Sequence, residues 1–123
     1  MFQSLGRYAK AEEYLKQALS IAKEIGDRKK EGEGYEKLGT VFQFRGEYVK
    51  AKEHHKKALA IKIEIGERKG EATVYKNLGV LFCSVGKYVK AEEYLQKALA
   101  ISKEIGDKKG EVFLLPAKPR KSR

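Results

Sequence analysis

The sequence contains only one cysteine and two prolines, and it has no long run of apolar residues. A single cysteine cannot form a disulfide within the chain, so a reducing, cytoplasmic setting is expected. The longest apolar runs, Val80–Cys83 and Val112–Leu115, are far shorter than the ~18 residues that a membrane-spanning helix needs. The segment Met1–Lys10 also lacks the apolar stretch of a secretory signal. These absences predict a chain that neither spans a membrane nor carries a signal peptide.

Basic residues outnumber acidic ones, and the formal net charge is +10. The last segment, 116–123, holds four basic residues and no acidic one, so subtracting four from +10 leaves +6 for the rest. We expect 116–123 to be a disordered basic tail, which could contact phosphate or act as a nuclear address. Elsewhere lysines alternate with glutamates, which is typical of a solvated helix face.

The chain repeats itself at an offset of 40 residues. Tyr48–Glu71 and Tyr88–Glu111 are identical at 16 of 24 positions, and Tyr8–Glu31 matches the last copy at 17 of 24. A fixed period of this size indicates stacked units of a few secondary-structure elements each. Such arrays offer extended surfaces more often than deep catalytic pockets.

Glycines divide each repeat at two positions, where a left-handed residue can end a helix. The glycines expected to do so are Gly6, Gly26, Gly46, Gly66, Gly86 and Gly106. In the middle unit this predicts a first helix near Lys30–Phe44 and a second near Tyr48–Ile65, each with one apolar stripe. The predicted fold is therefore all-α, an α-solenoid of antiparallel helix-turn-helix repeats.

The repeats also predict the domain organisation. An array over 1–115 would comprise a partial unit 1–27, full units 28–67 and 68–107, and the truncated start of a further unit, 108–115. Pro116 ends that last segment because it has no N–H to donate. Both ends have interior-type sequence, so we expect exposed apolar surface there. The chain would then self-associate into dimers or filaments, or be a fragment of a longer array.

Two glycines lie inside first helices, where glycine costs about 1 kcal/mol relative to alanine. Close approach of two helices would offset this cost. We expect Gly39 and Gly79 to face the small residues Ala51 and Ala91 of the second helices.

The pattern of large and small residues resembles that of tetratricopeptide repeats. The positions that carry the resemblance are Tyr35, Leu38, Gly39, Phe42, Tyr48, Ala51 and Ala58, with Tyr75, Leu78, Gly79, Phe82, Tyr88, Ala91 and Ala98 one unit later. Two departures are the 40-residue period, where the ordinary repeat has 34, and Ile63 or Lys103 in place of the usual closing proline. The 40-residue form is similar to arrays in Pins-type scaffolds and kinesin light chains.

The resemblance implies that the first helices form a superhelix with a concave groove that holds an extended peptide. The groove positions are Glu33, Glu36, Lys37, Thr40, Gln43, Phe44, Thr73, Lys76, Asn77, Val80, Cys83 and Ser84. Asn77 stands where related scaffolds bond the peptide backbone, because a carboxamide both donates and accepts. Lys37 occupies the matching position one unit earlier, so the asparagine ladder is broken.

The carboxylate clamp of chaperone-binding relatives is not intact in this sequence. Glu36 and Lys76 stand where clamp lysines would be, and Thr40 and Val80 where asparagines would be. Because Glu36 would repel a terminal carboxylate, chaperone C-terminal tails are not the expected ligand.

The reactive residue types show no catalytic or metal-binding arrangement. His54 and His55 are adjacent, so they diverge on a helix and cannot easily share a metal. His55 stands where Leu15 and Leu95 stand, and is expected to be a packing residue. Cys83 has no base one helical turn away, so it is expected only to line the groove. Neither an enzyme nor a cofactor or metal is predicted.

The predicted function is a non-catalytic scaffold that binds an extended, partly acidic peptide in the groove. One alternative is a self-assembling array, and another is a basic protein that binds nucleic acid or phosphate. A steep fall of DNA affinity with salt would favour the latter. The tail lacks interleaved aromatic residues, which argues against stacking on single strands.

Overall fold

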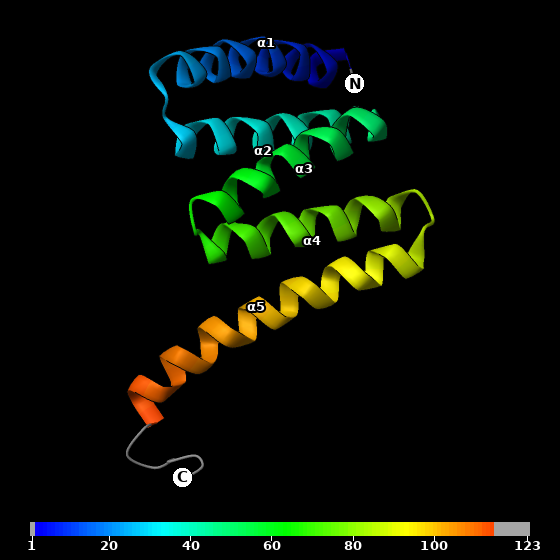
Figure 1. Ribbon diagram of the computed structural model, residues 1–123. Coiled ribbons are helices and arrows are strands. Elements are labelled where there is room, and N and C mark those ends of the chain that lie inside the picture. The colour runs from blue at the N-terminus through cyan, green and yellow to red at the C-terminus, as the bar shows by residue number, and fades with distance from the viewer. Residues whose placement is uncertain (1, 115–123) are drawn as a thin grey trace.

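The computed structural model describes the backbone of residues 2–114 and the side chains of residues 6–106. The described chain forms five helices and no strand: α1 Phe2–Ile25, α2 Arg28–Phe44, α3 Tyr48–Glu64, α4 Arg68–Ser84 and α5 Tyr88–Leu114. Consecutive helices run antiparallel and stack one after another (Figure 1). The predicted all-α solenoid is therefore confirmed. Within the described range, no helix combines the length and apolarity that crossing a bilayer requires.

Short glycine turns connect the helices. Gly26, Gly46, Gly66 and Gly86 have φ between +76° and +80°, a conformation that costs glycine little. At the first turn the Gly26 N–H donates to Lys23 O, and the Asp27 N–H donates to Ala22 O. These two bonds satisfy carbonyls at the end of α1. The turns thereby bring each helix back against the one before it.

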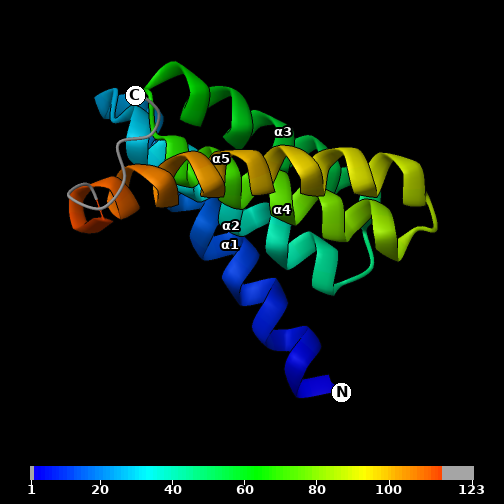
Figure 2. The same cartoon turned by 90° about the horizontal axis from the view of Figure 1, so that it is seen from below.

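The expected helix ends at Gly6 and Gly106 are wrong. Gly6 lies within α1, and α5 continues through Gly106 to Leu114. No further described helix packs back beyond either glycine, so no packing there offsets the interruption of helical hydrogen bonds. Both helices extend beyond the body of the stack (Figure 2). The division into units stays a prediction, and the expected tail 116–123 lies outside the described residues.

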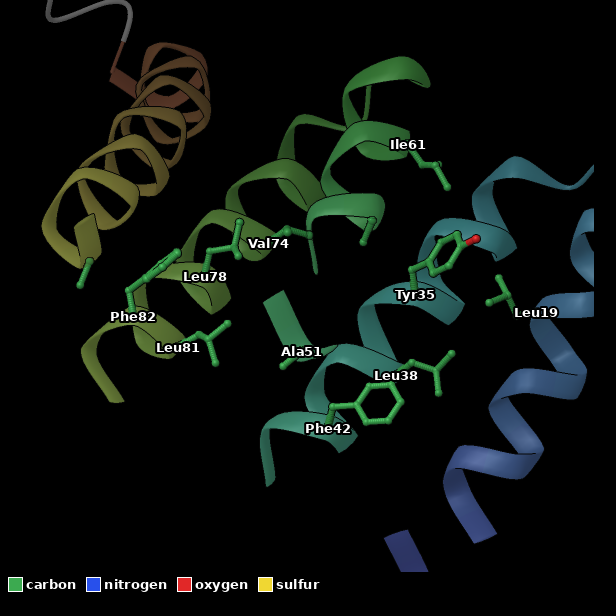
Figure 3. Packing of buried hydrophobic residues seen from close by; sticks show 12 residues of the cluster. Leu19, Tyr35, Leu38, Phe42, Ala51, Ile61, Val74, Leu78, Leu81 and Phe82 are labelled. Carbon is green, nitrogen blue, oxygen red and sulfur yellow. The ribbon is translucent and has the colours of Figure 1, made fainter. Parts of the chain in front are cut away.

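The apolar stripes of the helices meet in a continuous core (Figure 3). Leu38 and Leu78 are fully buried on α2 and α4, and Ala51 and Ala58 are fully buried on α3. Burying a leucine side chain contributes about 1.5–3 kcal/mol. The helix α3 packs against both α2 and α4, and this arrangement positions the surface described below.

Close helix contacts surround the two interior glycines, and the nearest side chains are those of His55 and Leu95. A Cβ on Gly39 would lie 2.8 Å from the His55 ring, and a Cβ on Gly79 would lie 2.6 Å from Leu95 Cγ. The three atoms nearest to a Cβ on Gly39 all belong to His55, and the expected facing of Gly39 and Ala51 stays a prediction. Ala91 approaches Gly79 through its backbone oxygen, which would lie 3.2 Å from a Cβ on that glycine. Side chains lean toward the helix N-terminus, so the residue one turn after each alanine covers the glycine.

His55 is confirmed as a packing residue. Its side chain is fully buried, and neither ring nitrogen has a hydrogen-bond partner. Burial, with a smaller contribution from the charge of His54, lowers the pKa of His55 to about 4. The imidazole is therefore neutral near pH 7.

Candidate functional site

A cleft of about 550 Å³ lies between α2, the end of α3 and the start of α4. We call it the α2–α4 cleft. Its lining residues are Glu33, Glu36, Lys62, Glu67, Arg68, Lys69, Gly70 and Thr73. Three of the predicted groove residues, Glu33, Glu36 and Thr73, are among them. The structure therefore brings together groove positions from two different units.

A second cleft, of about 340 Å³, lies between α4 and α5. We call it the α4–α5 cleft. It is lined by Lys69, Ala72, Thr73, Lys76, Ala98, Ser102, Ile105 and Gly106. Lys69 and Thr73 line both clefts, so the two hollows adjoin across α4. The predicted groove residue Lys76 belongs to this second cleft.

The other predicted groove residues lie outside these two clefts. Thr40, Gln43 and Asn77 are half-buried, whereas Lys37, Phe44, Val80, Cys83 and Ser84 are exposed. The hydroxyls of Thr40, Thr73 and Ser84 donate to carbonyls of their own helices, at 3.1–3.2 Å. These three hydroxyl hydrogens are consequently already engaged within the helix.

Lys62 is a cleft residue that sequence reasoning missed. Its side chain is only 5% exposed, and its Nζ lies 3.4 Å from Glu67 Oε1. A Cβ on Gly70 would come within 2.8 Å of Lys62 Cδ, so the missing side chain of Gly70 makes room for the lysine. Ala22 and Ser102 occupy the same repeat position. Comparing these three positions would have singled out Lys62.

The α2 side of the α2–α4 cleft carries acidic groups. Burial raises the pKa of Glu36, while the nearby charge of Lys62 acts in the opposite direction. Neither Glu33 nor Glu36 forms an ion pair with another described side chain. A half-buried carboxylate without a partner favours a cation or a hydrogen-bond donor beside it.

The α4 side of the surface is basic. Arg68 forms ion pairs with Glu71 at 3.0 Å and with Glu104 at 2.7 Å. Its charge is therefore already neutralised by groups of α4 and α5. Lys69 and Lys76 are exposed and form no ion pair with the described side chains. The surface thus changes from acidic on α2 to basic on α4. No group of three potential metal ligands occurs among the described residues.

The family model described as "Tetratricopeptide repeat" matches residues 1–64 and 31–104. No curated protein sequence matches the chain. Among solved structures, BtubC (BKLC) from P. vanneervenii is similar, with 29% identity and a TM-score of 0.74 over 80% of this chain. The match covers 41% of BtubC, so this chain spans less than half its length.

A second similar structure is the tetratricopeptide domain of Arabidopsis FLU. It is 26% identical, with a TM-score of 0.73, and the match covers 79% of this chain and 82% of that domain. Together with the family match over most of the sequence, the arrangement of helix pairs shows that the chain belongs to the tetratricopeptide repeat family.

Proposed function

We propose that the chain is a non-catalytic scaffold that binds an extended, partly acidic segment of another protein along α2 and α4. Tetratricopeptide repeats in general mediate protein–protein interaction. The observation that carries the proposal is the pair of adjoining clefts, which share Lys69 and Thr73. They supply a continuous path for a peptide from α2 across α4 to α5.

The charges along this path favour one orientation of the peptide. Lys69 and Lys76 suit acidic residues over α4, and Asn77 beside them can donate to and accept from a peptide backbone. Glu33 and Glu36 suit a basic or hydrogen-bond-donating residue over α2. Lysines at the rim would mainly speed association.

A peptide-binding measurement tests this proposal. A library of acidic peptides is bound to the wild type and to a variant with Lys76→Ala and Asn77→Ala. Selected peptides should bind the variant about tenfold more weakly, since a hydrogen bond to a charged group contributes about 1.5–3 kcal/mol. Lys56→Ala removes an exposed lysine of α3 and serves as the matched control. Equal binding by wild type and double variant would remove the groove proposal.

Self-association through the ends of the array is the second candidate. In α5, the Tyr94 ring stacks on Phe82 of α4, with centroids 5.5 Å apart. Tyr14 occupies the same position on α1 but is 74% exposed, and Ile21 and Ile25 beside it are also exposed. A first helix from another copy would cover this face.

Light scattering tests the second candidate. The wild type should form dimers or larger species as concentration rises, and a Tyr14→Ser, Ile21→Ser variant should stay monomeric. A wild type that is monomeric at every concentration contradicts it.

We also place the chain in the cytoplasm, since Cys83 is an exposed free thiol.

A further inference from the structure

Two equivalent junctions between neighbouring units differ in chemistry. The first junction consists of Tyr8, Glu12, Phe44, Arg45 and Glu47. Here the Tyr8 and Phe44 rings stack, with centroids 5.9 Å apart and planes 9° apart. Arg45 forms an ion pair with Glu12 and a second one, of 3.0 Å, with Glu47. Aromatic and charged side chains thus fill this junction.

The second junction lies 40 residues later and consists of Tyr48, Lys52, Ser84, Val85 and Lys87. Serine replaces the phenylalanine, so Tyr48 has no ring to stack on at this position. Valine replaces the arginine, and lysines replace both glutamates. The ion-pair network of the first junction therefore cannot form in the second.

These replacements leave an open apolar pocket of about 160 Å³. It is lined by Tyr48, Val49, Lys52, Leu81, Phe82, Val85 and Lys87. Leu81 and Phe82 are buried, whereas Val49 is 68% exposed and Val85 is 39% exposed. An apolar cavity of about 150 Å³ can hold a benzene ring, so this pocket has room for one large apolar side chain.

The charge at the rim selects the neighbours of that side chain. Lys52 and Lys87 form no ion pair with the described side chains. Glu12, Arg45 and Glu47 sum to −1 in the first junction, and Lys52, Val85 and Lys87 sum to +2 in the second. A carboxylate next to the inserted side chain would meet two lysines.

We propose that this pocket binds a protein segment in which one large apolar residue is flanked by aspartate or glutamate. The apolar side chain enters between Val49 and Val85, and the flanking carboxylates contact Lys52 and Lys87. The pocket lies near the α2–α3 and α4–α5 turns, at the opposite ends of the helices from the two clefts (Figure 1). It is a binding site distinct from the groove.

Fluorescence anisotropy with two labelled probes tests this site. The first is an acetylated and amidated peptide of sequence Glu-Glu-Phe-Glu-Glu, and the second has serine in place of phenylalanine. The phenylalanine peptide should bind at least about tenfold more tightly, because the pocket removes its phenyl ring from water. Equal binding of the two peptides would overturn the proposal.

A variant that rebuilds the first junction sharpens the test. Lys52→Glu together with Val85→Arg places at the second junction the residues that form the Glu12–Arg45 ion pair in the first. This double variant should bind the phenylalanine peptide at least about tenfold more weakly. Lys87→Glu changes only an exposed rim residue and should weaken binding in the same direction, which covers the case that the double variant fails to fold. Lys56→Ala removes an exposed lysine of α3 that does not line the pocket, and should leave binding unchanged. Undiminished binding by the folded rim variants contradicts the proposed site.

Discussion

The α2–α3 and α4–α5 hairpins share one backbone plan but bury different chemistry. Where α3 places His55 against Gly39, α5 places Leu95 against Gly79. Where α3 buries Lys62, α5 has the exposed Ser102. Packing positions of a repeat therefore tolerate ionisable residues as long as their size fits. The α2–α3 hairpin should depend on pH in a way that the α4–α5 hairpin does not.

The largest loss of stability is expected when the close helix contact found in both hairpins is disrupted. Gly79→Leu places a side chain where a Cβ alone would be 2.6 Å from Leu95 Cγ and 3.2 Å from a backbone oxygen. We expect the free energy of unfolding to fall by about 3 kcal/mol or more, measured by urea denaturation. Gly6→Leu is the control, since a Cβ there meets open space. An unchanged midpoint for Gly79→Leu would contradict the packing.

Acid should destabilise the α2–α3 hairpin more than the α4–α5 hairpin. The pKa of His55 is lowered from 6.5 to about 4 by burial and, to a smaller extent, by His54. Between these values the unfolded chain binds a proton that the folded chain does not. The stability that depends on a neutral His55 is fully present above pH 6.5. As pH falls to about 4, the free energy of unfolding decreases by about 3 kcal/mol in total.

Urea denaturation at pH 7 and pH 4.5 measures this effect. The wild type should lose more stability between the two values than a His55→Leu variant, which lacks the group. Groups common to both proteins cancel in that difference. The same loss in both proteins would show that His55 does not bring about the acid sensitivity.

A smaller effect is expected at neutral pH. His55→Leu copies the residue of the α4–α5 hairpin and removes two buried nitrogens that lack partners. Unsatisfied buried polar groups are costly, so the free energy of unfolding should rise by about 1–2 kcal/mol. Thermal and urea unfolding at pH 7.5 measure it. A loss of more than about 1 kcal/mol would reveal a specific partner of the imidazole.

Much of the fold could be predicted from local sequence patterns. The expected first helix Lys30–Phe44 and second helix Tyr48–Ile65 differ from α2 and α3 by two residues at one end and one at the other. Glycine turns and apolar periodicity depend on a few neighbouring residues, so they can be predicted from the sequence. The same local rule failed at Gly6 and Gly106, because a glycine ends a helix only where packing offsets the interruption.

The candidate site was less predictable. Glu33, Glu36, Thr73 and Lys76 do line the two clefts, while the role of the twelve groove positions in binding stays a prediction. Lys62 was missed because its position on the second helix is normally filled by a small residue. Only the contact with Gly70 of the following helix shows that its long side chain is accommodated.

The sequence by itself determined the repeat, the helix pairs and the family, because periodicity and turn residues are local properties. Only the tertiary structure decided which side chains share a surface. The pocket beside Val85 depends on residues brought together from α3 and α4, and the burial of Lys62 on the packing of three helices. Such contacts join residues far apart in the chain, and their free energy depends on the shape and charge of the space between them.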